Sequence, residues 1–404
     1  MDFNVSTDPP HVVDFRKEVA AWMAEQFKGQ EHLRWSASWS TREDKDEYKF
    51  RRGLAEKLGA KGWLFPLYPK KYGGAELTVD HQMVLETEIF KYGLNLSHVF
   101  YTLARIVAPV LIRWGTDEQK NEFLEPIMRA QICVWQVLTE PHGGSDIANC
   151  QTKAIRDGDH YVVNGQKVMV GHHLPPDYLW TLVCTNPQGK RHENLGWLHV
   201  PANLPGVTIQ HMNMMMGIKN AVFFDNVRVP AKYLIGGENN GWKVASTHME
   251  LEHGGDGRIA ADPLIERVVE YCRKTHIEGK PIIEDPRVRD LIAEMTIELN
   301  TLRRFNQLIY WRRFAKKPHP YGGPQQRYYQ RMLRLRNGER LQAIMGADAL
   351  EQNLSVHEVI DFEYAVRTGP GQLHGGGTLD TDRLIFARRL GLGRPTTEKA
   401  PETD

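Results

Sequence analysis

The sequence lacks the features that mark several large classes of protein. No apolar run approaches the about 20 residues of a membrane-spanning helix, so no membrane segment is expected. The formal net charge is only +1, which gives no overall field for nucleic acid or an anionic surface. The opening residues, MDFNVSTDPPHVVDF, have neither a basic start nor an apolar core, so a secretory signal is not expected and a cytoplasmic location is predicted.

Cysteine is scarce, and the common nucleotide-binding fingerprints are missing. The chain shows no CxxC spacing, and its four cysteines lie in apolar or strand-like and helix-like segments: Cys133, Cys150, Cys184 and Cys272. We therefore predict buried thiols in a reducing compartment and no metal site. There is no GxGxxG after a strand and no GxxxxGK[ST], which leaves Rossmann and P-loop folds without support.

The pattern of apolar residues divides the 404-residue chain into helical, β and helical parts. Residues 1–131 carry apolar residues at spacings of three and four, which predicts an N-terminal helical domain. Residues 132–240 are rich in β-branched runs with turns between them, which predicts a small β-barrel or sandwich. Residues 241–393 return to helical spacing and predict a bundle, while the tail 394–404 lacks apolar residues and is expected to be disordered. The expected fold class is α+β.

Two local signals refine this outline. Thr116 stands before the acidic start of TDEQKNEFLEPIMR and predicts a helix N-cap. In DGDHYVVNGQKVMV, β-branched runs flank Asn164-Gly165, and this pair predicts the turn of a β-hairpin.

The loop LTEPHGGSD, residues 138–146, follows an apolar run and precedes the β segments. Paired glycines allow backbone amides to approach a ligand closely, and Thr139 and Ser145 add hydroxyl groups. A dinucleotide or a flavin suits such a loop. Taken alone, the same residues also describe an ordinary glycine turn.

Six motifs in the same order resemble those of the acyl-CoA dehydrogenase family, over about residues 48–392. The loop LTEPHGGSD looks like the LTEPxxGSD of that family, and VNGQKVMV is similar to its NGxKxWIT segment. MGIKNAVFFDNVRVP resembles a bacterial subgroup that acts on bulky or steroid-derived acyl-CoAs. The other matching segments are GWLFPLYPKKYGGAE, GWKVA with GKPIIEDPRVRDLIAEM, and GGGTLDTDRLIFARRLG. The resemblance implies an N-terminal helical domain, a middle β domain and a C-terminal four-helix bundle.

The resemblance also implies FAD as the cofactor. On the family pattern, Leu138 and Thr139 contact the pyrimidine edge of the flavin, and Gly144 and Ser145 reach the pyrophosphate. Thr378 lies near the other end of the cofactor, or caps the helix that follows, or does both.

Further cofactor positions depart from the family pattern. The Trp-Ile-Thr that packs on the flavin is replaced here by Met169, Val170 and Gly171, so a flat ring and a hydroxyl are absent. His172 and His173 follow directly and are either turn residues or groups that titrate near the flavin. Arg273 is the nearest candidate for the arginine on the adenosine side.

The reaction that the resemblance implies is α,β-dehydrogenation of an acyl-CoA thioester. A carboxylate takes the α-proton, and the β-hydride passes to flavin N5; a base for so weak an acid needs a raised pKa in a dry site. The usual base, the Glu of a C-terminal EGT, is replaced here by Gly376. Some relatives place the base on the helix after GWKVA, where an ungapped count selects Glu252. Solvated helix-face carboxylate is the other reading of this residue.

Three functions stay open. The first is a dehydrogenase with Glu252 as base, an acyl-CoA substrate, electron-transfer flavoprotein as electron acceptor, and a homodimeric or homotetrameric assembly. The second is a flavin monooxygenase or oxidase on the same fold, in which His172, His173 or His374 supplies the acid or base. The third is a non-catalytic subunit of a hetero-oligomeric dehydrogenase.

Overall fold

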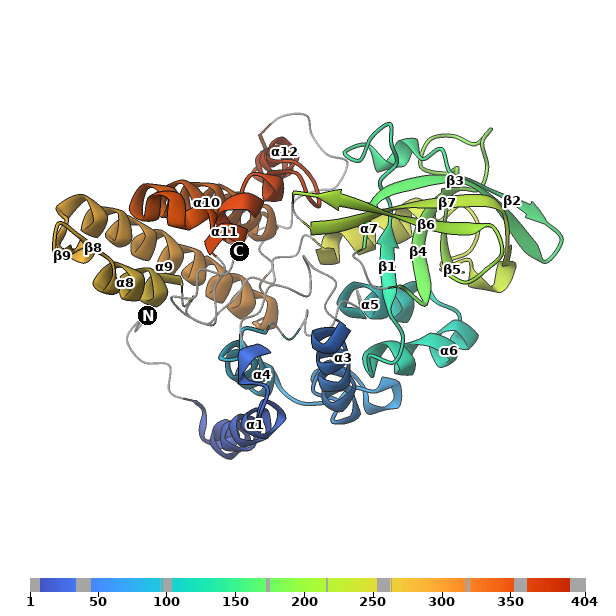
Figure 1. Ribbon diagram of the computed structural model, residues 1–404. Helices are drawn as coiled ribbons and strands as arrows, with labels where there is room; N and C mark the ends of the chain where they lie inside the picture. The colour runs from blue at the N-terminus through green and yellow to red at the C-terminus, as the bar shows by residue number, and fades with distance from the viewer. Residues whose placement is uncertain are drawn as a thin grey trace. The chain divides into compact units, whose positions relative to one another are not determined.

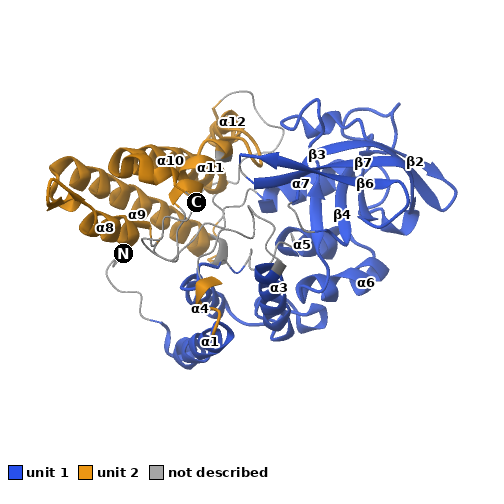
Figure 2. Ribbon diagram, in the orientation of Figure 1, with its two compact units in different colours: residues 1–28, 38–252 blue, residues 29–37, 253–404 orange. Residues whose placement is uncertain are grey.

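The computed structural model describes residues 8–33, 45–94, 96, 104–171, 175–215, 217–252, 262, 264–315, 317, 320–351 and 362–392. The chain divides into two compact units (Figure 2). Unit 1 comprises residues 1–28 and 38–252, and unit 2 comprises residues 29–37 and 253–404. Each unit has a hydrophobic core of its own. His172, His173 and the tail 394–404 lie outside the described residues.

Unit 1 contains helices in the segments where the apolar spacing of the sequence predicts them (Figure 1). Their bounds are α1 (Val13–Gln26), α3 (Lys45–Ala60), α4 (Val79–Phe90), α5 (Ala104–Trp114), α6 (Asp117–Met128) and α7 (Gly241–Glu252). The prediction of an N-cap at Thr116 is confirmed: its hydroxyl accepts a hydrogen bond from the amide of Gln119, and the Gln119 side chain bonds back to the Thr116 amide. This capping box fixes the start of α6.

A seven-stranded sheet forms the β part of unit 1 (Figure 1). The strands run in the order β1-β4-β2-β3-β7-β6, and β5 pairs with β4. Their bounds are β1 (Val134–Val137), β2 (Lys153–Asp157), β3 (His160–Val170), β4 (Tyr178–Cys184), β5 (Leu195–Pro201), β6 (Val207–Met214) and β7 (Gly217–Pro230). Most pairs are antiparallel, whereas β1 pairs with β4 in parallel.

The segment between β1 and β2 leaves the sheet and then returns to it. Strand β1 pairs in parallel with residues 178–181 of β4, and Lys153 at the start of β2 pairs in parallel with Cys184 at the end of β4. The backbone amide of Cys184 also donates to the carbonyl of Thr152. Residues 138–152 are therefore an excursion whose two ends are anchored by one neighbouring strand.

The prediction of a hairpin turn at Asn164-Gly165 is wrong. Strand β3 continues through this pair, and the turn lies instead at Gly158-Asp159, since Asp157 pairs with His160. The register with β7 shifts between Val163 and Gly165, so the pair marks a β-bulge. A Cβ at residue 165 would lie 2.7 Å from the Cα of Thr152, which explains the glycine by close backbone approach rather than by a turn.

Helices α5, α6 and α7 share one core with strands β1, β4 and β5 of the sheet. Apolar side chains from all these elements pack together, among them Val107, Leu111, Phe123, Trp180 and Trp197. Polar contacts tie the helices to one another and to the chain after β7: the Trp114 indole donates to the hydroxyl of Thr247 at 3.0 Å, and the Gln119 amide donates to the carbonyl of Leu234 at 3.0 Å. These contacts hold α7 against α5, and α6 against the segment after β7.

Unit 2 is helical, with a short hairpin of β8 (His276–Ile277) and β9 (Lys280–Pro281). Its helices are α8 (Leu264–Lys274), α9 (Pro286–Phe314), α10 (Gly322–Met345), α11 (Phe362–Thr368) and α12 (Leu379–Arg389). Their apolar faces meet in a core that includes Tyr271, Met295 and Leu341. Helices α9 and α10 are also joined by ion pairs from Glu298 to Arg336 and Arg340.

The observed elements confirm the expected α+β fold class, with helices first, strands next and helices last. The four cysteines are free and buried, as predicted. Within the described part of the chain, no helix combines the length and the apolar character needed to cross a membrane.

Candidate active site

The loop at residues 138–146 connects β1 to a short 3-10 helix, Ile147–Asn149. Leu138 is buried and Thr139 is half-buried, whereas Gly144 and Ser145 are exposed. The amide of Val168 on β3 donates to the carbonyl of Thr139 at 2.9 Å, which ties the loop to the sheet. A Cβ on Gly144 would lie 3.0 Å from the Thr139 methyl carbon. The loop therefore folds tightly on itself at Gly144, where there is little room for a side chain.

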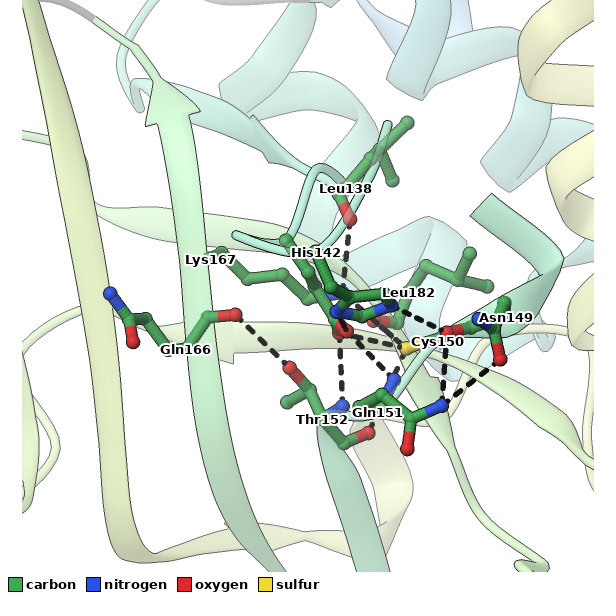
Figure 3. Close-up of polar contacts among 10 residues, drawn as sticks. Leu138, His142, Asn149, Cys150, Gln151, Thr152, Gln166, Lys167 and Leu182 are labelled. Carbon is green, nitrogen blue, oxygen red and sulfur yellow. Dashed lines mark hydrogen bonds and ion pairs between the residues drawn. The ribbon is translucent and has the colours of Figure 1, made fainter. Parts of the chain in front are cut away.

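A buried ion pair between Lys167 and Glu140 fixes this loop to strand β3 (Figure 3). The ammonium of Lys167 on β3 lies 2.8 Å from Oε1 of Glu140 and donates to the carbonyl of Leu138 at 3.1 Å. Lys167 is fully buried, and Glu140 is 4% exposed. The carboxylate also accepts from the amides of Gln151 and Thr152, at 2.7 and 2.9 Å. One charged pair therefore fixes both ends of the excursion between β1 and β2.

The electrostatics of this pair favour the ionised state of Glu140. Burial alone would raise the pKa of the carboxyl, but the charge and hydrogen bond of Lys167 and the donated amides lower it to about 2. Cys150 lies in the same cluster, with its sulfur 3.4 Å from the Lys167 ammonium. Burial raises the pKa of this thiol to about 12, so it is a packed thiol and not a nucleophile.

The exposed end of the loop presents hydrogen-bond donors. Within the described residues, the amides of Gly144 and Ser145 have no backbone acceptor, and the Ser145 hydroxyl stands beside them. No side chain projects from Gly143 or Gly144 to cover these donors. Such a group of amides and a hydroxyl fits the negatively charged pyrophosphate of a dinucleotide.

The end of β3 places Met169 and Gly171 beside β1. Met169 has φ +60° and is 53% exposed, and the register with β7 shifts between Lys167 and Val170. Gly171 has φ +53°, and a Cβ there would lie 2.3 Å from the Trp135 ring. The side chain of Trp135 thus occupies the space that a residue with a Cβ would need, which explains the glycine at this position.

Gly171→Ala is expected to lower the free energy of unfolding by at least about 2 kcal/mol, because it adds a clash with a buried ring to a strained backbone. Denaturant midpoints measure the loss. Gly158→Ala is the matched control, since Gly158 also has a positive φ, of +63°, but no atom within 4 Å of the added carbon. Equal losses in the two variants would show that the Trp135 contact contributes nothing.

Glu252 is the last residue of α7, and it reaches β1. Its Oε2 accepts a hydrogen bond from the side-chain amide of Gln136 at 3.1 Å. The same oxygen lies 3.7 Å from Nε2 of His248, one turn earlier on α7. The Glu252 side chain is 21% exposed. The carboxylate is therefore neither a solvated surface group nor sealed in the core.

The structure brings several predicted site residues together around β1 in unit 1. Trp135 contacts Gly171, Gln136 contacts Glu252, and β1 leads directly into Leu138 and Thr139. The two remaining candidates lie in unit 2. Arg273 is exposed in the last turn of α8, and Thr378 is the N-cap of α12, where its hydroxyl accepts from the Thr381 amide at 3.2 Å.

Residues 375–377, where the family resemblance places the usual base, contain no carboxylate and are held by arginines within unit 2. Arg331 on α10 donates to the carbonyls of Gly375 and Gly377, and Arg327 donates to the carbonyl of Gly376. Arg331 also pairs with the buried carboxylate of Asp382 on α12, at 2.8 Å. The nearby His374 is exposed.

Sequence analysis does not single out four residues that lie near the loop or near Glu252: Gln136, Glu140, Lys167 and His248. The alternation of side chains along β3 could have indicated that Lys167 is buried, because it lies on the same face of the strand as the buried Tyr161 and Val163. A lysine on an inward face needs a carboxylate partner. No comparable signal identifies His248, whose role depends on contacts between α7 and the sheet.

Comparisons with known proteins come from sequence and structure. Three models of the acyl-CoA dehydrogenase family match, for its N-terminal domain at residues 11–131, its middle domain at 136–227 and its C-terminal domain at 239–391. The chain is similar to acyl-CoA dehydrogenase FadE29 of Mycobacterium tuberculosis, 31% identical over 64% of this chain and 66% of the relative. It is also similar to acyl-CoA dehydrogenase IpdE1 of Mycobacterium tuberculosis, 30% identical over 73% of this chain and 76% of the relative.

Two solved structures resemble the whole chain. The Tcur3481-Tcur3483 steroid ACAD is 26% identical with a TM-score of 0.78, and the ChsE4-ChsE5 complex from Mycobacterium tuberculosis is 26% identical with a TM-score of 0.80. Each match covers 98% of this chain and 100% of the other. Against the curated relatives FadE29 and FadE26, by contrast, the chain spans slightly less than two thirds of their length, 66% and 65%.

Proposed function

The chain belongs to the acyl-CoA dehydrogenase family, and from this premise we propose that it oxidises the α,β carbon–carbon bond of an acyl-CoA thioester, with Glu252 as the base and FAD as cofactor. The observation that carries the proposal is the carboxylate of Glu252, which contacts Gln136 on β1 two residues before the predicted flavin loop. The segment at residues 375–377 supplies no competing carboxylate.

The cofactor site that we propose in unit 1 consists of Leu138, Thr139, Gly144, Ser145, Met169 and Gly171. Support comes from the donors of Gly144 and Ser145, which fit a pyrophosphate, and from the rigid Glu140–Lys167 support under the loop. Arg273 and Thr378 of unit 2 are proposed contacts on the family pattern alone. When bound, FAD supplies the acceptor for the β-hydride.

The work of the protein is to remove the α-proton and to hold the reacting groups. Glu252 takes the proton, and the Gln136 amide keeps its carboxylate in one orientation. Its partial burial at the end of α7 removes much of the competing water. The buried ion pair between Lys167 and Glu140 keeps the loop in one conformation when the cofactor binds.

A bulky, ring-containing acyl group is the substrate class we propose. Gly375, Gly376 and Gly377 add no side-chain volume, and one structural relative is described as a steroid ACAD. Electron-transfer flavoprotein is the proposed electron acceptor. A homodimer or homotetramer is the proposed assembly, and a hetero-oligomer is its alternative, since the ChsE4-ChsE5 relative is a complex of two different chains.

An anaerobic titration tests this function. The visible flavin band of the purified protein is expected to bleach on addition of an acyl-CoA, within a panel of butyryl-CoA, octanoyl-CoA and cholanoyl-CoA, and most completely with the steroid-derived thioester. A flavin that stays oxidised with every thioester, yet consumes oxygen after reduction by dithionite, would favour a monooxygenase. A preparation without flavin would favour a non-catalytic subunit.

A further inference from the structure

We propose that His248 is a positioning residue that orients the carboxylate of Glu252, an inference that rests on the proposed role of Glu252 as base. The two residues are four apart on α7 and so lie on the same face of the helix. Nε2 of His248 lies 3.7 Å from Oε2 of Glu252. The Gln136 amide approaches the same oxygen from β1 at 3.1 Å.

The ring of His248 is held rigidly in the core of unit 1. His248 is completely buried, and it packs against the Trp197 ring with centroids 5.0 Å apart. The indole Nε1 of Trp180 on β4 also lies 3.2 Å from Nδ1 of His248. The imidazole is therefore fixed from two strands, from β4 by Trp180 and from β5 by Trp197.

The Trp180 contact decides which ring nitrogen of His248 carries the proton. An indole nitrogen can only donate, so Nδ1 must be the acceptor and carries no hydrogen. In a neutral imidazole the hydrogen then resides on Nε2, the nitrogen nearest to Glu252. Trp180 thus sets His248 as a donor directed to the base.

This protonation state allows His248 to position Glu252 but not to relay its proton. A nitrogen that already carries hydrogen cannot take the proton that Glu252 removes from substrate, but it can donate to the carboxylate and limit its rotation. The distance of 3.7 Å is longer than a hydrogen bond. Catalytic contacts commonly tighten only with substrate present, and a small side-chain rotation of Glu252 would close this one.

Two amide substitutions distinguish a role of His248 in positioning Glu252 from a role in accepting the Trp180 hydrogen bond alone. In His248→Gln, the amide nitrogen can donate to Glu252 from near the place of Nε2. In His248→Asn, the shorter side chain can accept from Trp180 but cannot reach Glu252. If His248 positions the base, the Asn variant is slow and the Gln variant is close to wild type; if His248 only satisfies Trp180, the order is reversed.

Anaerobic stopped-flow reduction of the flavin by cholanoyl-CoA measures this order in the full-length holoenzyme. We expect His248→Asn to lower the limiting rate about tenfold, equivalent to one hydrogen bond to a charged group, with an unchanged half-saturating substrate concentration. We expect His248→Gln to retain the rate within about threefold. Equal rates in wild type and the Asn variant, or a Gln variant as slow as the Asn variant, would overturn the proposal.

A second readout does not depend on turnover. Nitrogen-15 NMR of the histidine side chains, with the His248→Asn variant used for assignment, is expected to show hydrogen on Nε2 alone at neutral pH. Hydrogen on Nδ1 would overturn the proposal without touching the assignment of the base. Conversely, a Glu252→Gln variant that still reduces at the wild-type rate would refute the base itself, whatever the state of His248.

Discussion

Glu252→Gln is expected to slow reduction of the flavin by an acyl-CoA by about 10²- to 10⁴-fold, while FAD remains bound. The amide nearly matches the carboxylate in volume and can still contact Gln136, so binding and folding are preserved. It cannot accept the α-proton. Rapid-mixing measurement of flavin absorbance under anaerobic conditions gives the rate, and the visible spectrum gives the amount of bound flavin.

The matched control is Glu250→Gln, two residues earlier on the same helix. Glu250 is exposed, whereas Glu252 reaches β1, so this control removes an equal charge from α7 without touching the site. We expect it to reduce at the wild-type rate. If both variants react normally, the base lies elsewhere in the protein, and a loss in both would indicate an effect of helix charge rather than proton abstraction.

Lys167→Met is expected to lower the free energy of unfolding by about 3–5 kcal/mol and to weaken FAD binding. The substitution leaves the carboxylate of Glu140 buried without its ammonium partner, beneath the loop that holds the proposed cofactor contacts. Urea denaturation of the protein freed of flavin measures stability, and fluorescence titration with FAD measures affinity. Both quantities are expected to change together.

Two controls separate the buried pair from charge in general. Replacing both partners, Lys167→Met with Glu140→Leu, removes the unpaired charge and is expected to recover much of the lost stability. Arg156→Met breaks an ion pair with Glu238 that is about half exposed, and it is expected to leave the denaturation midpoint unchanged. A Lys167→Met protein as stable as wild type would mean that Glu140 is not ionised there.

The same pair predicts a loss of stability in acid. The pKa of Glu140 is lowered to about 2 in the folded protein, against 4.5 as its ordinary value. Its contribution is therefore fully present above about pH 4.5 and disappears as the pH falls towards about 2, a change of roughly 3 kcal/mol. In the double variant this part of the acid dependence should be missing.

Much of the fold could be predicted because periodicity and capping are local properties. The helix–strand–helix order, the α6 N-cap at Thr116 and the burial of the cysteines all follow from short stretches of sequence. The role of Asn164-Gly165 could not be predicted correctly, because the glycine is required by a close approach to Thr152, thirteen residues earlier in the chain and just before β2. A dipeptide cannot reveal which neighbour requires it.

The site shows the same division. Sequence motifs identify the loop at residues 138–146 as a cofactor site and Glu252 as a base. Both roles stay predictions. The sequence shows that Gly171 departs from the motif that it resembles. Only the structure shows the reason, which is that the Trp135 ring occupies the space of a side chain. His248 is an ordinary helix residue until Trp180 is placed against it.

The backbone at Gly376, held by arginines, limits which side chains position 376 can accept. Gly376 has φ +66°, a backbone conformation that costs an ordinary residue about 1–2 kcal/mol, and its carbonyl is bonded to Arg327. A glutamate at position 376 would place that strain into a backbone that Arg331 fixes on both sides. A glutamate introduced by this single substitution is therefore expected to lower the stability of unit 2 by about 1–2 kcal/mol, because the arginine contacts prevent the backbone from relaxing to another φ.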